Sequence, residues 1–499
     1  MIHPITESVE FIGNWFLPNA ENAKKIAGTL SWSTQRASLD LHDAFTPLQG
    51  TVYGDEFQSY PVVYGTTINS KFITMLKATG GAKGLSFGPA GINQTEKVAS
   101  NLVVVGGHVT PETHYKEIRV RIPGLQIWIG RMGIQQTFLH KTEHSSSGVI
   151  YQIDALPEET TEVPCLPATL GWGIDRRFSG DLISEISVRS SACLRIQPGQ
   201  PQKLDWYFEQ IGKTTTLLAF MAGSPMSPDH ITAKAADSNL EVEVLVALRD
   251  AKYCEHKSGS NFYMLRNDMG ADLEAVIMKW FELYDTFSAP SQLALSVLSS
   301  KDLWLHVEFL TLMQALEGFH RATMPGLYTS ESEYEAIRKT LSNAIPNTVK
   351  PDHKDALKAR IKYGNEISLR KRLDALVNRL PIDLRQNVLG NDGTVPNSWV
   401  DTRNYYTHWD ETSRESVLDG IGMHRAGVRM KHLLRALYLD LVGIPHSSII
   451  KSLGNACSES QYLIQLNGIE HRKKNPGSQA GAFMHISVSD AGNSDESAS

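Results

Sequence analysis

Arg403 and His408 are the two residues of this 499-residue chain whose types and spacing best fit a chemical site. Histidine titrates near neutral pH and can therefore move a proton. Arginine stays charged, and its planar fork of donors matches the oxygens of a phosphate group. Cleavage of RNA needs both functions, because a proton must leave the ribose 2′-hydroxyl while negative charge builds on the phosphate. The pair therefore predicts RNA chemistry.

The spacing of the pair restricts the backbone around it. On an ideal helix, a separation of five residues turns the second side chain by about 140° from the first. Both groups can face one substrate only if the helix ends or bends there. Pro396 upstream and Gly420 downstream leave room for such an end. Tyr405 and Tyr406, between the pair, could stack on exposed bases.

The same two residues also fit purely structural roles. The chain has 17 histidines, so an Arg and a His five positions apart are expected about once by chance. Arg403 would then pair with a neighbouring acid, and His408 would make a packing or surface contact. Composition alone leaves both interpretations open.

Two other short motifs lack the context that their chemistry requires. Gly212-Lys213-Thr214 matches the end of a phosphate-binding loop, but Tyr207 stands where that motif needs its first glycine. The segment Gly84–Gly88 (GLSFG) matches a serine nucleophile elbow, which needs a strand before it and a helix after it. Its neighbours are rich in glycine and predict a loop instead.

Metal ligands and cofactor motifs are not indicated. His108 and His114 lack the spacing that places two ligands on one helical face. The four cysteines are scattered, with no paired spacing for zinc. We therefore expect no metal and no cofactor.

Hydrophobic periodicity predicts an α+β, multidomain chain. Up to about residue 270, apolar and polar residues alternate as in half-buried strands, for example over 118–122 and 240–246. This alternation favours a mostly antiparallel, sandwich-like β domain (1–270). At least one helix is expected within it, near 204–218. From residue 271 the period becomes 3.6, which predicts an all-α bundle (271–465). Pro290 is expected to end its first helix. The polar segment 466–499 predicts a disordered tail.

Composition narrows the class of protein. Hydrophobic residues make up 41% and charged residues 20%, as in ordinary globular proteins. The net charge of −6 argues against a protein that coats nucleic acid over its whole surface. Two basic clusters, over 351–380 and 425–435, could be local binding patches or solvated helix faces. No apolar run is long enough to span a membrane, and the first residues do not resemble a secretory signal, so we expect a cytoplasmic location.

The run Arg403-Asn404-Tyr405-Tyr406-Thr407-His408 resembles the R-N-x-x-x-H signature of HEPN ribonucleases. The segment 309–320 (FLTLMQALEGFH) resembles the first long helix of their ApeA-like branch, and the strand-rich region resembles the ApeA N-terminal domain by its general pattern. The resemblance implies a HEPN bundle that forms a homodimer or a higher homo-oligomer, with two Arg/His motifs in a composite cleft. It also implies metal-independent cleavage of RNA that leaves a cyclic phosphate, in bacterial antiviral defence by abortive infection.

The resemblance also assigns roles to individual residues. Arg403 would orient and stabilise the phosphate, His408 would act as general acid or base, and Asn404 would hold the motif by hydrogen bonds. Glu317, in the helix that resembles the first helix of the family, would orient Arg403. The alternative role of Glu317 is that of a solvated charge on the helix surface. Family members include enzymes that cut tRNA in the anticodon loop, so tRNA is one candidate substrate.

Two alternatives stay open at this point. Some HEPN-like bundles bind nucleotides or partner proteins without activity, and the intact Arg403/His408 pair counts against that interpretation. A second alternative places the chemistry in the N-terminal domain, where no catalytic constellation is evident. Our hypothesis is that this domain senses a phage-derived trigger and restrains the nuclease.

Overall fold

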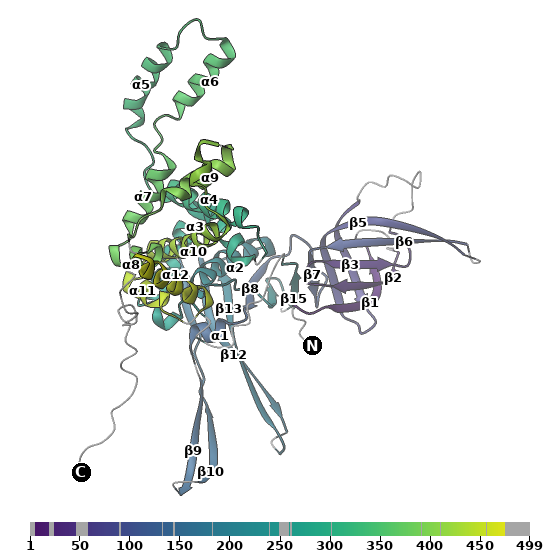
Figure 1. The fold of residues 1–499 in the computed structure, drawn as a ribbon. Coiled ribbons are helices and arrows are strands. Elements are labelled where there is room, and N and C mark those ends of the chain that lie inside the picture. The colour runs from purple at the N-terminus through teal and green to yellow at the C-terminus, as the bar shows by residue number, and fades with distance from the viewer. Residues whose placement is uncertain are drawn as a thin grey trace. The chain divides into compact units, whose positions relative to one another are not determined.

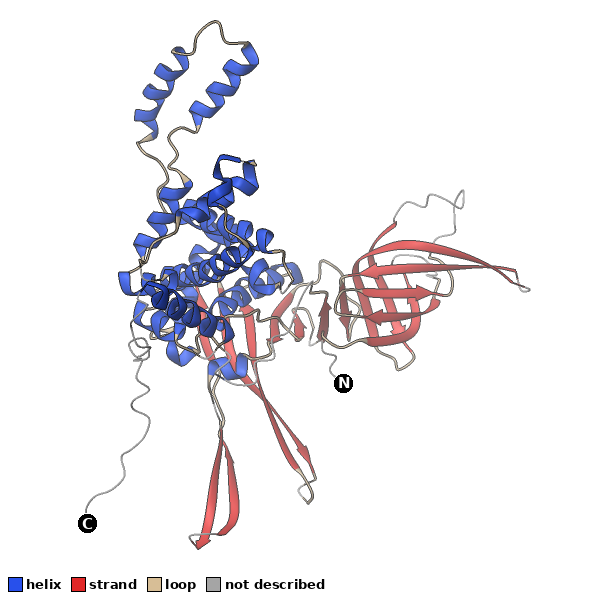
Figure 2. Ribbon diagram, in the orientation of Figure 1, coloured by secondary structure: helices blue, strands red, loops and turns tan. Residues whose placement is uncertain are grey.

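A computed structural model describes residues 5–18, 24–45, 58–88, 91–131, 133–142, 145–181, 183–238, 240–248, 259, 262–300, 302–390, 392–409, 411–455 and 457–474. The chain divides into two compact units (Figure 1). Unit 1 comprises 1–268 and 272–282, and unit 2 comprises 269–271 and 283–499. Strands dominate unit 1 and helices dominate unit 2 (Figure 2), so the predicted α+β multidomain class is confirmed. Among the described residues, no helix is both long and apolar enough to cross a membrane.

Unit 1 contains a closed antiparallel barrel that continues into an open sheet, not two packed sheets as the sandwich-like prediction assumed. Around the barrel the strand order is β5-β4-β1-β2-β3-β6, and β6 pairs back to β5. Closure removes the exposed strand edges that a sandwich would retain. The barrel strands are β1 (Val9–Phe16), β2 (Ile26–Trp32), β3 (Ala37–Leu41), β4 (Gln58–Thr67), β5 (Phe72–Gly88) and β6 (Gly91–Ser100).

The open part of the sheet runs in the order β7-β15-β14-β8-β13-β12-β11. These strands are β7 (Leu102–Val105), β8 (Tyr115–Arg121), β11 (Glu159–Val163), β12 (Ala168–Gly180), β13 (Ile186–Pro198), β14 (His230–Ala235) and β15 (Glu241–Val246). A separate ladder pairs β9 (Ile134–Thr142) with β10 (Ser145–Ile153). Unit 1 also contains α1 (Leu125–Ile129) and α2 (Leu204–Ala222), the second of which confirms the helix predicted near 204–218. Its residues 272–282 include the first turns of the next helix.

The first helix of the C-terminal half, α3 (Leu273–Ser299), does not end at Pro290 as predicted. It continues through the proline, with non-helical dihedral angles at Phe287, three residues earlier. Proline removes one backbone donor and crowds the preceding turn. A kink accommodates this, so α3 bends instead of ending.

Unit 2 packs around α4 (Leu305–Thr323) and α10 (Gly420–Leu441). The predicted apolar face of α4 is confirmed, because Phe309, Leu312, Leu316 and Phe319 are all buried. Phe319 meets Tyr438 of α10 edge-to-face, with ring centroids 4.8 Å apart. The other helices are α5 (Glu331–Asn343), α6 (Pro351–Lys362), α7 (Leu369–Arg379), α8 (Ile382–Leu389), α9 (Asn397–His408), α11 (His446–Leu453) and α12 (Ser458–Lys474).

The start predicted for the polar tail, residue 466, is too early. Helix α12 continues to Lys474, with Leu466 buried and Glu470 paired with Arg429 of α10 at 2.8 Å. These contacts stabilise residues 466–474 as part of a helix, although their polar composition alone predicted disorder. Residues 475–499 lie outside the described part of the chain.

Candidate active site at the end of helix α9

Helix α9 ends at His408, which confirms the prediction that the helix ends or bends at the motif. Trp409 follows in the left-handed region, at φ 53°, and its N–H donates to the Tyr405 carbonyl at 2.7 Å. The other side of α9 is anchored by the buried Trp399 and by Thr402, whose hydroxyl accepts from the Leu418 N–H at 2.9 Å. A non-glycine residue in this region costs free energy, and such strain is found preferentially at functional sites.

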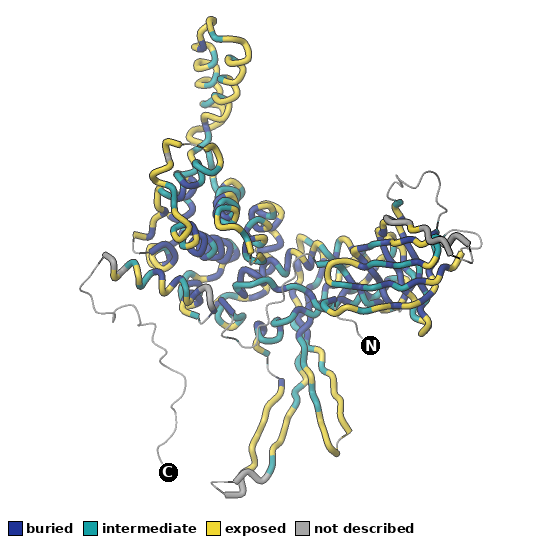
Figure 3. The backbone as a smooth tube through the Cα atoms, turned by 45° about the vertical axis from the view of Figure 1, so that its right-hand side comes forward, coloured by how far each residue is buried: buried dark blue, intermediate teal, exposed yellow. Residues whose placement is uncertain are grey.

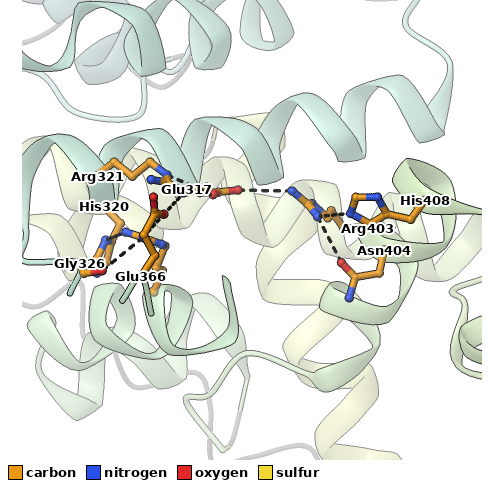
Figure 4. Close-up of polar contacts among 9 residues, drawn as sticks. Glu317, His320, Arg321, Gly326, Glu366, Arg403, Asn404 and His408 are labelled. Atoms are coloured by element: carbon orange, nitrogen blue, oxygen red, sulfur yellow. Dashed lines mark hydrogen bonds and ion pairs between the residues drawn. The ribbon is translucent and has the colours of Figure 1, made fainter. Parts of the chain in front are cut away.

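The side chains of Arg403 and His408 meet at this helix end (Figure 4). Nη1 of Arg403 lies 3.3 Å from Nε2 of His408 and also donates to Oδ1 of Asn404 at 3.3 Å. A guanidinium has donors and no acceptors, so Nε2 accepts and the imidazole proton is on Nδ1. His408 is exposed, and Arg403 and Asn404 are half-buried. The acceptor nitrogen of the imidazole therefore lies at the surface, in contact with a fixed positive charge.

Glu317 of α4 holds the opposite side of the Arg403 guanidinium. Its Oε2 lies 3.6 Å from Nη2 of Arg403, and the two side chains are 21% and 27% exposed. The contact is an ion pair rather than a short hydrogen bond, which leaves the remaining donors of Arg403 available. The carboxylate thus limits the positions that the guanidinium can take.

The contacts of Glu317 continue into a chain of alternating charges. Arg321 lies 3.1 Å from Glu317 and 2.7 Å from Glu366, and Glu366 lies 3.0 Å from Arg372 (Figure 4). The hydrogen bond to Glu366 is the main cause that raises the pKa of Arg321. The Arg372 side chain is 3% exposed, so the chain of charges begins in the interior of unit 2 and reaches the surface at the motif.

His320 lies at the interior end of this chain. Its Nδ1 is 3.2 Å from Nη1 of Arg372 and accepts from it, so the imidazole is neutral in this contact. Burial lowers the pKa of His320, and the positive charges of Arg372 and Arg321 lower it further. A neutral buried imidazole is the form that this environment stabilises.

A surface pocket of about 510 Å³ lies between α4 and α9. Its lining combines apolar and polar groups with one carboxylate and two guanidinium groups. A cleft with this charge balance can accept a phosphate group and exclude part of the surrounding water. The lining residues are Leu310, Gln314, Glu317, Gly318, Arg321, Arg403 and Thr407.

The tyrosines of the motif are less accessible than the stacking prediction assumed. Both are half-buried, and the Tyr406 ring is stacked on His306, with an interplanar angle of 15° and centroids 5.8 Å apart. Trp409, 70% exposed and in edge contact with Tyr405, offers an open aromatic face at this helix end. The sequence did not single out Trp409, because its left-handed conformation is not visible in a pattern of residue types.

Two of the motifs set aside on sequence grounds lie in regular elements. Lys213, the lysine of the apparent phosphate loop, is a buried residue of α2 that pairs with Glu209 at 2.9 Å. The segment Gly84–Gly88 is part of β5 and pairs with β6, so the loop predicted there was wrong. Its alternation of small and larger residues suits a strand as well as a loop. Neither segment has the geometry that its apparent motif requires.

Many residues of the two basic clusters are internal ion-pair partners and not a solvated face. Arg429 and Arg435 of α10 are 5% and 0% exposed. Burial of a guanidinium is tolerated when carboxylates and carbonyls satisfy it. The pairs are Arg370–Asp374, Arg372–Glu366, Arg379–Asp440, Arg429–Glu470 and Lys431–Glu308. The lysines of α6, in contrast, are exposed or half-buried.

Among the described residues, no group of three or more His, Cys, Asp or Glu side chains is placed to hold a metal ion.

The Arg321 and Glu366 contacts are the part of the site that the sequence did not indicate. The spacing of Glu317 and Arg321 is that of a helical ion pair, but such pairs are common on solvated faces. Nothing in the sequence brings Glu366 to them across 45 residues.

Comparison with known families gives two matches. Residues 10–280 match the model of ApeA N-terminal domain 1, and residues 310–448 match the model of Apea-like HEPN. No curated protein and no solved structure matched the chain. The second match contains α9, the pocket and the charge chain. Since the first alone spans more than half of the sequence, the chain belongs to the family of ApeA-like HEPN proteins.

Proposed function

We propose that this chain is a metal-independent endoribonuclease that uses Arg403 and His408. The observation that carries the proposal is their contact at 3.3 Å on the exposed end of α9, beside a pocket with a second guanidinium. Membership of a HEPN family supports it. A neutral imidazole with its lone pair at Nε2 has the form that a general base requires.

In the proposed reaction, the ribose 2′-hydroxyl replaces Nη1 of Arg403 as the donor to Nε2 of His408. Nε2 takes the hydroxyl proton, and that oxygen attacks the adjacent phosphorus. The bond from phosphorus to the 5′-oxygen breaks, and that oxygen receives a proton from a second, protonated imidazole, which the composite cleft described next would supply. The products are a 2′,3′-cyclic phosphate and a 5′-hydroxyl, so no water is consumed. Arg403 stabilises the negative charge that builds on the phosphate oxygens, and Asn404 and Glu317 hold the guanidinium in place.

A composite cleft formed by two copies of the chain is part of the proposal. The exposed position of His408 leaves its outer side open to a second subunit or to substrate. A partner motif would supply a second Arg/His pair, so that one imidazole acts as base while the other protonates the leaving oxygen. Heterodimers of one wild-type and one His408→Ala subunit test this arrangement: they are expected to be inactive, and full activity per wild-type subunit would contradict it.

The biological setting remains a proposal drawn from the family. We propose that the enzyme acts in the cytoplasm as a toxin in antiviral abortive infection, that tRNA is one substrate, and that unit 1 binds a phage-derived trigger. Cross-linking of the full chain in infected cells tests the last point. A trigger cross-linked within residues 10–280 is expected, whereas cross-links confined to the helical unit would contradict it.

The test of the catalytic proposal is cleavage of RNA by the purified full chain in excess chelator. Wild type is expected to cut, and His408→Ala and Arg403→Ala are expected to lose the activity. Sequencing of the RNA ends identifies the substrate, the cut position and the end chemistry together. A folded wild-type chain that binds RNA without cutting it would favour the alternative of a non-catalytic HEPN-like binding module.

A further inference from the structure

Helices α5 and α6 form a helical arm that packs little against the rest of unit 2. Neither helix buries a residue, and the arm extends from the neighbouring helices (Figures 1 and 3). Its helices are stabilised locally, by a capping box between Ser330 and Glu333 and by Pro351 in the first turn of α6. An exposed arm with its own helix-stabilising features is suited to contact a partner.

The cations of α6 differ from those of α7 and α10. Lys350, at the N-cap, and Lys354, Lys358 and Lys362 follow one another at intervals of four residues, which places them along one side of the helix. In the described part of the chain, Lys350 and Lys358 have no acidic partner within ion-pair distance. Arg370 and Arg379 of α7 and Arg429 of α10 are instead paired with carboxylates. Unneutralised positive charge therefore gathers on α6.

Acidic residues of the arm do not cancel this charge. On α5, Glu333 is occupied in the capping box and Glu335 pairs with Arg338 at 2.6 Å. Glu331 lies in the first turn of α5, where its charge favours the helix N-terminus. Residues 350–362 contain five Lys or Arg and two Asp, counted from the sequence, so this segment carries a net positive charge.

Two exposed aromatic rings lie where the arm joins the other helices. Tyr328 is 52% and Tyr363 is 62% exposed. A lysine ammonium lies near each ring, at 4.4 Å from the Tyr328 centroid for Lys371 and at 5.8 Å from the Tyr363 centroid for Lys362. Lysines beside open aromatic faces are the combination that binds single-stranded nucleic acid, because bases stack while the cations contact phosphates.

The base of the arm is tied to the pocket of the candidate active site. Asn365 bonds to the backbone of Thr329 in both directions, at 3.0 and 2.9 Å, which closes the arm. The next residue, Glu366, lies 2.7 Å from Arg321, and Arg321 lines the pocket. The residue that closes the arm is therefore followed directly by a partner of the pocket lining.

We propose that the arm surface, formed by Tyr328, Tyr363, Lys350, Lys358, Lys362 and Lys371, binds the single-stranded RNA that extends from the pocket. The inference rests on the proposed ribonuclease function and adds a binding surface to it. Positive charge that tracks a phosphate backbone and rings that stack on bases both favour RNA over a protein partner. The surface would select long or looped RNA over short fragments.

The test is the affinity of the full chain for a 2′-O-methyl RNA that cannot be cut, measured by fluorescence anisotropy over a series of KCl concentrations. Neutralising Lys350, Lys358 and Lys362 together to Gln is expected to lower the slope of log affinity against log salt by about 2, or about 0.7 for each phosphate contact. Affinity at the lowest salt is expected to fall at least about tenfold.

Matched controls separate the effect of the arm surface on RNA binding from the effect of the net charge of the chain. Replacing the exposed lysines Lys24, Lys97 and Lys116 of unit 1 with Gln removes the same charge and is expected to leave the slope unchanged. Tyr363→Ala is expected to weaken binding about tenfold, and Tyr363→Phe to retain it. Equal slopes for the two triple variants, or no RNA binding by wild type, would overturn the inference.

This binding experiment is independent of catalysis. Cleavage that depends on His408, together with unchanged binding by the arm variants, would overturn the arm surface and leave the ribonuclease proposal intact. Arm-dependent binding without cleavage would overturn the ribonuclease proposal and leave the arm surface intact.

Discussion

The guanidinium of Arg403 lies 3.3 Å from the imidazole of His408, although five residues of continuous helix would direct the two side chains about 140° apart. The helix ends directly after His408, where Trp409 adopts the left-handed conformation. The His408 side chain therefore lies at the end of the helix, with no following helical turn beside it.

Trp409 is expected to matter through its backbone conformation. Trp409→Gly favours the left-handed region and should retain activity, because glycine adopts positive φ without strain. Trp409→Pro cannot adopt φ 53°, and it also removes the N–H that donates to Tyr405. We expect the proline variant to lose at least about 100-fold in kcat with unit 2 still folded. Cleavage assays with circular dichroism check this, and equal activity of both variants would contradict it.

Glu317→Gln is expected to lower kcat about tenfold, about 1.4 kcal/mol of transition-state stabilisation, with a smaller change in KM. The amide keeps the size of the side chain but loses the charge that holds Arg403. Glu335→Gln, which breaks the exposed pair with Arg338, is the matched control and should have no effect. A loss confined to KM would assign Glu317 to substrate binding instead.

Glu366→Gln is expected to destabilise unit 2 by about 1–3 kcal/mol, because the buried guanidinium of Arg372 loses its carboxylate. Urea unfolding measures the change in free energy of unfolding. Glu335→Gln again serves as the comparison and should cost less than about 1 kcal/mol, as expected for a surface pair. If the two variants were equally stable, Glu366 would not be a structural anchor of the charge chain.

His320 is expected to make unit 2 less stable in acid. Burial lowers its pKa in the folded chain below the unfolded value of 6.5, so the unfolded chain binds more protons as pH falls through this window. Its contribution to stability is therefore complete above about pH 6.5 and is lost as pH falls toward the folded pKa. Hydrogen exchange of α4 and α7 amides at pH 7.5 and 5.5 measures this. His320→Gln should reduce the difference, whereas the exposed His353→Gln should not.

Periodicity was sufficient for the elements that bury one regular face. The apolar stripe of α4 and the helix near 204–218 follow from spacing alone, because burial repeats with the geometry of the helix. Closure of the barrel was not predictable in this way, since the pairing of β5 with β6 and of β6 with β3 depends on strand register rather than on residue types.

The candidate site was only partly predictable for a similar reason. The motif residues are close in sequence, so Arg403, Asn404 and His408 could be recognised together. Glu317 was suggested by family resemblance, and in the structure its carboxylate forms an ion pair with Arg403. Glu366 reaches Arg321 only through the tertiary fold, and no local pattern records such a contact.

The most direct measurement of the central claim is cleavage of RNA in chelator by wild type, His408→Ala and Arg403→Ala, with mapping of the RNA ends. We expect wild-type cutting that leaves a 2′,3′-cyclic phosphate and a 5′-hydroxyl, and a loss of at least about 1000-fold in kcat/KM for each variant, or about 4 kcal/mol. Undiminished cutting by both folded variants, or products with a 5′-phosphate, would contradict the claim.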